Sequence, residues 1–212
     1  MLDPYVYEDT GVLINKLGIK DYEELRQAEA DISFVKLLTV DRDVDCREFG
    51  IDYLKDIHKY ILEDIFDWAG EFRTIPMEKE ERVLSGKSVQ FAYPDEIEEK
   101  VKHSLHKINA INWNAQSLDE KSLNFTKLIA ELWQIHPFRD GNTRTITTFA
   151  FRFAEERGFK MQRSLLLDHF QYVRDSLVMA SIGEYSEYKY LNKIIKDAIQ
   201  REAKEEEKQK ER

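Results

Sequence analysis

Cysteine is almost absent from this chain of 212 residues, and glycine and proline are sparse. The single cysteine, Cys46, has no partner for a disulfide within the chain and cannot build a cysteine zinc site. A reducing compartment fits this usage. The 8 glycines and 4 prolines leave few turns, while strong helix formers such as Glu, Lys, Leu, Ile and Ala dominate. The composition therefore predicts a mainly α-helical protein, organised as one domain with appendages.

An excess of positive charge is also missing, because the formal net charge is −9. A basic surface for nucleic acid is therefore not expected, although a local pocket for phosphate remains compatible with this charge. The start, MLDPYVYEDTGVL, has no basic segment followed by an apolar run, so no secretory signal is expected. No apolar run approaches the roughly 20 residues that a bilayer requires, so we expect no membrane partner.

Helical periodicity of apolar residues recurs along most of the chain. Residues 1–20 read as an ordered arm or a short helix, and residues 201–212 as a frayed helix end or a disordered charged tail. Between them, helices are predicted at residues 21–40, 51–69, 94–108, 119–135, 142–158, 168–180 and 185–200. Gly70 is expected to stop the second helix, and Pro137 to end the fourth.

Residues 71–93 break the helical pattern. Weak alternation of apolar side chains appears on both sides of a charged stretch, EKEER, and of Ser85-Gly86. Such a pattern predicts a hairpin-like flap with a polar tip over about residues 74–91.

The segment HPFRDGNTR, residues 136–144, lies between two predicted helices. Gly141 allows a sharp turn, and the next helix would point its first N–H groups and its positive dipole end into the loop, which suits phosphate. Asn142 and Arg144 add donors, Asp140 offers a carboxylate for a divalent metal, and His136 offers a proton acceptor near neutral pH. Taken in pieces, the segment is an ordinary turn and helix cap. Taken together, it indicates transfer of a phosphorus-containing group to a hydroxyl.

This segment resembles the Fic family motif, H-x-F-x-[D/E]-G-N-G-R-x-x-R. The matching residues are His136, Phe138, Asp140, Gly141, Asn142 and Arg144. Residues 54–73, LKDIHKYILEDIFDWAGEFR, are similar to the family's helix ending in W-A-G-x-x-R. The N-terminal segment is similar to the arm of some bacterial Fic toxins, so the resemblance covers roughly residues 3–200.

The resemblance implies a mainly α Fic fold, a helical bundle with a β-hairpin flap over the active site. It implies a protein adenylyltransferase that moves AMP from ATP, with Mg²⁺, to a Ser, Thr or Tyr hydroxyl of a target protein. His136 would be the general base and Asp140 the metal ligand. The nucleotide-binding residues would be Gly141, Asn142, Thr143 and Arg144.

The target would bind through the flap by strand addition, with Thr74, Ile75, Val89 and Phe91 as the contact residues. The resemblance also divides the chain into an N-terminal arm and helix (1–50), a Fic core with the flap (51–178), and a C-terminal helix with a charged tail (179–212). Its place would be the cytoplasm, either the bacterial cytosol or a host cytosol if the protein is delivered as an effector.

The chain departs from the family motif at two positions. Thr143 replaces a glycine, and Thr147 stands where a second arginine would meet the γ-phosphate, a contact worth about 1.5–3 kcal/mol in general. Arg139 or Arg152 could compensate. No segment matches the family's inhibitory pattern, [S/T]-x-x-x-E-[G/N], so control would come from a separate antitoxin-like protein or be absent.

Two alternatives to AMP transfer stay open. Thr147 leaves room for UMP or GMP transfer, and the Doc branch of the family transfers the terminal phosphate instead. From a different class, the domain could be a catalytically weakened module that binds a partner strand through its flap. Among the other residues, His58 is expected to be a packed, hydrogen-bonded helix residue, and Arg73 to tie the flap base to the core.

Overall fold

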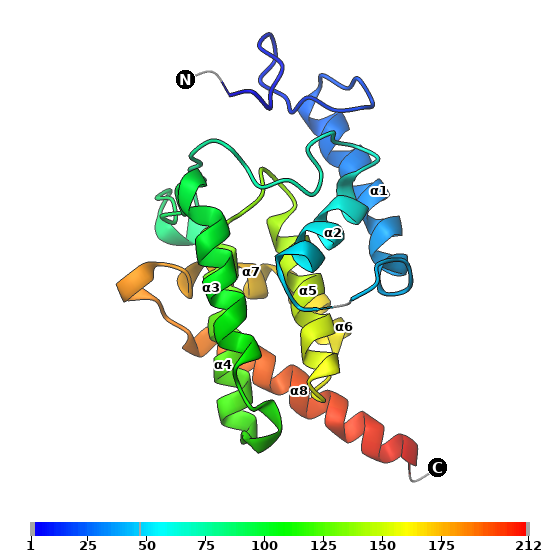
Figure 1. Ribbon diagram of the computed structural model, residues 1–212, viewed down its shortest axis with the longest axis vertical. Coiled ribbons are helices and arrows are strands. Elements are labelled where there is room, and N and C mark those ends of the chain that lie inside the picture. The colour runs from blue at the N-terminus through cyan, green and yellow to red at the C-terminus, as the bar shows by residue number, and fades with distance from the viewer. Residues whose placement is uncertain (1–2, 47, 211–212) are drawn as a thin grey trace.

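The computed structural model describes residues 3–46 and 48–210, and most of them are helical, as expected (Figure 1). The α-helices are α1 (Tyr22–Asp43), α2 (Ile51–Leu62), α3 (Ile97–Asn109), α4 (Leu118–Ile135), α5 (Asn142–Glu156), α6 (Arg163–Asp168), α7 (Phe170–Met179) and α8 (Lys189–Lys210). Short 3-10 turns lie at η1 (Arg82–Leu84), η2 (Pro94–Glu96), η3 (Trp113–Ala115) and η4 (Gly183–Tyr185).

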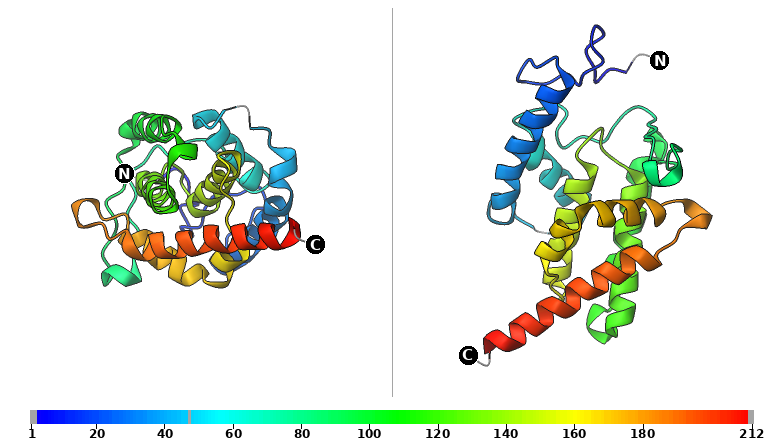
Figure 2. Two further views of the ribbon diagram at one scale, coloured as in Figure 1. Left: turned by 90° about the horizontal axis from the view of Figure 1, so that it is seen from below. Right: turned by 180° about the vertical axis from the view of Figure 1, so that it is seen from behind.

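Helices α4 and α5 form the centre of the bundle (Figure 2). Helix α4 packs against α3, α5, α7 and α8, while α5 also packs against α2, which in turn carries α1. Phe125 and Trp133 of α4 and Phe149 and Phe153 of α5 are at most 1% exposed. Burial of each such side chain contributes about 1.5–3 kcal/mol. The short loop between α4 and α5 therefore joins two helices whose positions the core holds firmly.

The ends of α4 are set by local sequence. At its start, the Ser117 hydroxyl accepts the N–H of Glu120 and the Glu120 carboxylate accepts the N–H of Ser117, so the two residues form a capping box. At its end, His136 adopts the left-handed conformation with φ +52°, and Pro137 follows. The predicted helix at residues 119–135 is thus confirmed.

Helix α2 ends earlier than expected, at Leu62 instead of residue 69. Residues 63–70 form turns in which Ile65 and Phe66 both donate to the Leu62 carbonyl. The N–H of Gly70 donates to the Nδ1 atom of His58 at 2.8 Å, not to a carbonyl four residues earlier. This side-chain bond holds residues 63–70 against α2. Ile65 and Phe66 therefore remain buried as in the apolar period, although the helix has ended.

The β-hairpin predicted for the flap is not confirmed. Among the residues that the structure describes there is no strand, and the flap has a single bridge between Glu80 and Ser88. Pro76 has no N–H to give to a ladder, and the N–H of Lys79 donates to the Ser88 hydroxyl instead of a backbone carbonyl. The flap is therefore an extended segment that closes only at its tip, around η1.

Residues 3–20 form an ordered arm, with a bridge between Val6 and Leu13. In Figure 1 the arm lies at the opposite end of the molecule from the C-terminal helix. The Asp21 side chain then caps α1 by accepting the N–H of Glu24.

The charged C-terminal segment is more ordered than predicted. Residues 201–210 continue α8, so the expected helix end is found and the disordered tail is wrong for them, while residues 211–212 lie outside the described part. Gln162 donates to the Glu205 carboxylate at 2.6 Å, and Lys160 lies 3.3 Å from Glu206. These contacts to the turn before α6 hold a helix that has no apolar face of its own there. Within the described residues, no helix is both long and apolar enough to cross a bilayer.

Candidate active site

The segment HPFRDGNTR forms the loop between α4 and α5 together with the first turn of α5, as the sequence predicts. Asn142 closes this loop from within, because its Oδ1 atom accepts the N–H of Phe138 and its Nδ2 atom donates to the Phe138 carbonyl. Phe138 is fully buried and its ring stacks on His58 with 3.8 Å between centroids. Asn142 therefore shapes the loop with both polar atoms of its side chain. From the sequence, only a contact of this side chain with phosphate was expected.

His58 of α2 holds the other side of the loop. Because its Nδ1 atom accepts the N–H of Gly70, its Nε2 atom carries the proton and donates to the Asp140 carbonyl at 3.1 Å. Burial lowers the pKa of His58 to about 4, which keeps this neutral form at physiological pH. The expectation of a packed, hydrogen-bonded residue is confirmed. Its hydrogen bond to the loop was not predicted, because His58 and Asp140 are far apart in the sequence.

Gly141 sits where no other residue fits without strain. Its φ is +72°, and a Cβ atom built there would lie 2.5 Å from Leu62 Cδ1 and 3.4 Å from His58 Nε2. Gly141 is also the N-cap of α5 and places no side chain over the helix end. The N–H groups of Asn142, Thr143 and Arg144 have no acceptor earlier in the helix, so the open mouth of α5 is suited to an anion.

His136 opens the loop and is only 5% exposed. Its Nδ1–H donates to the Trp133 carbonyl at 3.3 Å, which leaves the Nε2 atom as the proton acceptor. Its ring is covered by Phe91 of the flap, 4.1 Å away between centroids. Burial, and next the positive charge of Lys79, lower the pKa of His136 to about 3, so the imidazole is neutral at physiological pH.

Asp140 is the one acidic residue of the loop, and its side chain is 45% exposed. One carboxylate oxygen accepts the N–H of Gly141 at 2.6 Å and lies 3.9 Å from Arg144. Within residues 3–46 and 48–210, no cluster of three His, Cys, Asp or Glu side chains could hold a metal by itself. A single carboxylate beside an anion-binding helix end fits Mg²⁺, which prefers one or two carboxylates together with substrate phosphates.

Arg144 has partners that the sequence did not reveal. Its guanidinium donates to the Glu29 carboxylate and, at 2.7 Å, to the Ser33 hydroxyl, both on α1. Burial, and next the Asp140 carboxylate, raise the pKa of Glu29 above its ordinary value, whereas the Arg144 charge opposes that rise. Glu29 and Ser33 are four residues apart and so share one helix face. That spacing was the available signal, but nothing local linked it to Arg144.

A cavity of about 430 Å³ opens beside this pair, between the N-terminal arm, α1 and the loop. Arg26, Arg139, Asp140 and Arg144 all line it. Arginine side chains around a cavity next to the mouth of α5 suit the outer phosphates of a nucleotide.

The two departures from the family motif have structural explanations. The Thr143 hydroxyl accepts the indole N–H of Trp133 at 3.0 Å, so its side chain is turned toward α4. The Thr147 hydroxyl donates to backbone carbonyls of its own helix. Arg139 pairs with Asp3 at the cavity, whereas Arg152 pairs with Asp41 and lines a different cavity. Of the two compensating arginines suggested by the sequence, only Arg139 belongs to the loop and lines the cavity beside Arg144.

The flap base is tied to the loop through Arg73, as expected. This arginine is 2% exposed and donates to the carbonyls of His136, Ile75 and Ala92. Of the predicted flap residues, Val89 and Phe91 are buried, Ile75 is half-buried, and Thr74 is exposed and bonded to the Tyr5 hydroxyl. The structure thus brings the flap base, His136 and the loop together.

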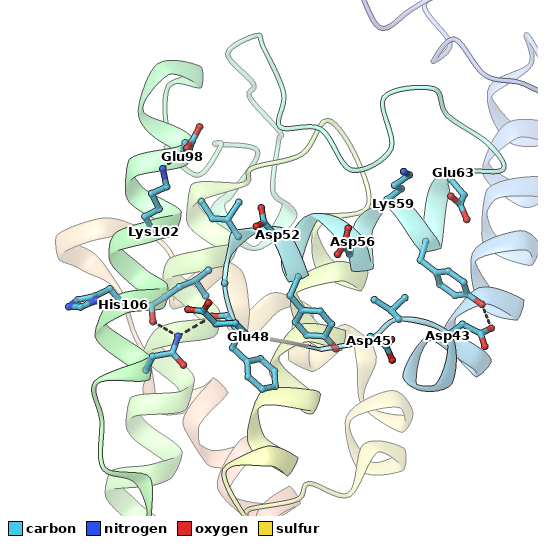
Figure 3. A pocket seen from close by; sticks show the side chains of 18 residues that line it. Asp43, Asp45, Glu48, Asp52, Asp56, Lys59, Glu63, Glu98, Lys102 and His106 are labelled. Atoms are coloured by element: carbon cyan, nitrogen blue, oxygen red, sulfur yellow. Dashed lines mark hydrogen bonds and ion pairs between the residues drawn. The ribbon is translucent and has the colours of Figure 1, made fainter.

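A cavity of about 1010 Å³ elsewhere has the opposite character (Figure 3). In its lining, acidic side chains from α1, α2, α3 and the segments on either side of α2 outnumber the basic ones. The acidic residues are Asp43, Asp45, Glu48, Asp52, Asp56, Glu63 and Glu98. A polyphosphate would be repelled there, so this cavity is not a second candidate for a nucleotide.

Known proteins resemble this chain in both sequence and fold. Residues 48–154, half of the chain, match the sequence profile of the Fic/DOC family. The chain is 29% identical over 183 residues to the protein adenylyltransferase VbhT of Bartonella schoenbuchensis, covering 86% of this chain and 36% of VbhT. It is also 29% identical over 170 residues to the probable protein adenylyltransferase y4lH of Sinorhizobium fredii, covering 77% of this chain and 81% of y4lH. The chain thus spans only about a third of the length of VbhT.

Among solved structures, the N-terminal Fic domain of a VirB-translocated Bep effector protein from Bartonella quintana, with bound ADP, is similar in fold. Its TM-score to this chain is 0.74 at 24% identity, over 92% of this chain and 93% of that one. The likeness establishes a mainly helical Fic fold.

Replacement of Gly141 by alanine tests the tight packing of the loop. Gly158 is the matched control, because its φ is +76° and a Cβ atom there would meet nothing within 4 Å. Gly158→Ala should cost only the left-handed strain of about 1–2 kcal/mol, whereas Gly141→Ala should cost about 1–3 kcal/mol more from the clash with Leu62. Urea unfolding of both variants measures the difference. Equal losses of stability would contradict the packing described here.

The buried state of His136 predicts a pH-dependent stability. Its folded pKa of about 3 lies below the ordinary 6.5, so below pH 6.5 the unfolded chain binds a proton that the folded chain does not. Its contribution to stability is therefore complete above pH 6.5 and is lost as pH falls, by up to about 1.4 kcal/mol per unit. Compared with His136→Gln, the wild type should lose more stability between pH 6.5 and 4. His103→Gln, at an exposed position of α3, is the control. Parallel curves for wild type and His136→Gln would show that the imidazole is not buried in its neutral form.

Proposed function

This chain belongs to the Fic/DOC family, and from that membership we propose that it is a nucleotidyltransferase that moves AMP from ATP to a hydroxyl of a target protein. One observation carries the proposal: the loop between α4 and α5 gathers a neutral imidazole, an accessible carboxylate and the open end of a helix. Support comes from VbhT and y4lH, whose names describe adenylyltransferases, and from the similar Fic domain with bound ADP.

In the proposed reaction the target hydroxyl oxygen attacks the α-phosphorus of ATP. The bond from the α-phosphorus to the bridging oxygen breaks, pyrophosphate leaves, and the hydroxyl proton passes to the Nε2 atom of His136. The Nδ1 bond to Trp133 holds the ring in the tautomer that this step needs. The backbone N–H groups of Asn142 to Arg144 would bind the α-phosphate and the charge that develops there.

Mg²⁺ would be held by Asp140 together with the phosphates, where it would neutralise charge on the leaving pyrophosphate. Arg144 would meet the outer phosphates from the 430 Å³ cavity. To do so, it would exchange Glu29 and Ser33 for phosphate oxygens. A triphosphate is a stronger competitor for a guanidinium than one carboxylate whose pKa burial has raised.

The target protein would lie along the flap, with its backbone beside residues 75–79 and its hydroxyl near His136. Pro76 gives that segment a gap in its donors, so strand addition there would depend on the neighbouring residues. We also propose that the Fic core comprises residues 51–178. The protein would act in the cytoplasm of the bacterial or of a host cell, and a separate antitoxin-like protein would control it. Transfer of UMP or GMP is the second candidate, because the Thr147 hydroxyl is bonded within α5 and offers no cation to the γ-phosphate.

Labelled nucleotides test the reaction directly. With Mg²⁺ and a cell lysate, label from α-labelled ATP should appear on protein, and label from γ-labelled ATP should not. His136→Ala should reduce the transfer by about 10²–10⁴-fold, the usual contribution of a general base, while His103→Ala should have no effect. Label from the γ position would instead indicate phosphate transfer. Stronger transfer from labelled UTP or GTP would mean that this nucleotide, and not ATP, is the donor. Absence of all label with intact wild-type protein would favour the binding-module alternative.

Glu29→Gln should free Arg144 for the nucleotide. Loss of the carboxylate charge removes the competing partner, so we expect the Kd for ATP with Mg²⁺ to fall about tenfold, as charge-assisted hydrogen bonds usually contribute 1.5–3 kcal/mol. Calorimetric titration measures this Kd. Asp31→Asn, which removes an exposed carboxylate of the same helix that does not line the cavity, is the matched control. Weaker binding by Glu29→Gln would mean that Glu29 helps to position the nucleotide and does not compete with it.

A further inference from the structure

Glu81, at the tip of the flap, is a buried charge on an otherwise exposed segment. It is 2% exposed, whereas its flap neighbours Lys79 and Glu80 are exposed. Its carboxylate receives both terminal nitrogens of Arg174 of α7, at 2.6 and 2.9 Å. Such a two-point geometry is the strongest form of arginine–carboxylate pair.

The backbone of Glu81 also organises the tip. Its N–H donates to the Lys87 carbonyl, and its own carbonyl accepts the N–H groups of Leu84 and Gly86. One residue thus closes the loop of the tip and joins it to α7. The right-hand view of Figure 2 shows η1 next to α7, and the two elements are in contact.

The rest of the flap has little internal support. Between the tip and the base at Arg73, the single bridge from Glu80 to Ser88 replaces the ladder of a hairpin. A segment without a ladder keeps its path only if both ends are held. Arg73 fixes the base against the His136 carbonyl and Met77 packs against the core, so the position of the tip is the remaining constraint on where residues 75–79 run relative to His136.

We infer that Arg174 is a positioning residue of the reaction: through Glu81 it anchors the flap tip on α7 and thereby sets where a target backbone lies against His136. This inference rests on the proposed function, because it concerns the target of that same site. Arg174 itself touches neither the loop nor the nucleotide-binding end of α5. A second pair at the tip, Arg82 with Asp175 at 3.2 Å, is weaker because the Arg82 side chain is 80% exposed.

Hydrogen exchange measures the anchoring without any ligand. In Arg174→Met, the amides of residues 80–88 should exchange about thirtyfold faster than in wild type, because Glu81 loses its partner and leaves its buried position. Glu81→Gln should act in the same direction. The double variant should exchange no faster than the single ones if the two residues act as one pair. Arg82→Met, which removes a charge from the same tip, should change exchange by less than about fivefold.

Activity then distinguishes positioning from simple support. Transfer of α-labelled AMP is followed at increasing concentrations of lysate protein, and the Kd for ATP with Mg²⁺ is measured by calorimetry. For Arg174→Met we expect half-maximal labelling to need at least about five times more lysate protein, with the nucleotide Kd unchanged within twofold. If Arg174→Met lowers the Tm of the whole chain, Arg174→Lys, which keeps the charge but loses the two-point geometry, replaces it in both measurements.

Each outcome decides the inference. Unchanged exchange at residues 80–88 in Arg174→Met would overturn it, whatever the labelling. Faster exchange with an unchanged dependence on lysate protein would overturn the positioning role and leave a structural pair. If wild-type protein transfers no label from any nucleotide, the proposed function fails and the positioning role fails with it, while the exchange data still decide whether Arg174 anchors the tip.

Discussion

The hydrogen bond from His58 to the Asp140 carbonyl is the contact on which the site depends. It joins α2 to the loop between α4 and α5, and the same imidazole accepts the Gly70 N–H, so the end of α2 and the loop share one anchor. The ring also supports Phe138 by stacking, and Leu62 of the same helix leaves room only for a glycine at 141. A neutral, buried histidine can do this because it is both donor and acceptor. Displacement of His58 would release the loop that carries the His136 imidazole and the Asp140 carboxylate.

Much of this site could be predicted because it is local. The helix end at Pro137 and the sharp turn at Gly141 follow from neighbouring residues, so the loop and the two helices beside it were predicted. The end of α2 was not, because a side-chain bond from His58 to Gly70 replaced a helical one. The Glu29–Arg144 pair spans 115 positions and was invisible to any local pattern. The flap looked like a hairpin because alternation records side-chain facing and says nothing of whether backbone ladder bonds form.

In the proposed function, local contacts hold the reacting groups, whereas contacts between residues far apart in the sequence hold the segment that would bind the target. The reacting groups sit on a loop between two core helices, where packing leaves them little freedom. The target, in contrast, would meet a segment without a ladder, held at its base by Arg73 and at its tip by the buried pair of Glu81 and Arg174. Arg144 belongs to neither group, since Glu29 and Ser33 on α1 now accept the guanidinium N–H groups that outer phosphates would need. One small bundle can therefore combine a firmly packed loop for the reacting groups with a less constrained flap for the target.

We propose that one polyphosphate binds where the open end of α5 meets His136 and Asp140. Amide chemical shifts of the labelled protein, recorded while a non-hydrolysable ATP analogue with Mg²⁺ is added, test this claim most directly. The largest shifts should fall on the N–H groups of Asn142, Thr143 and Arg144. Saturable shifts confined to the acidic cavity around Asp52 and Asp56, or no saturable shifts at all, would contradict it.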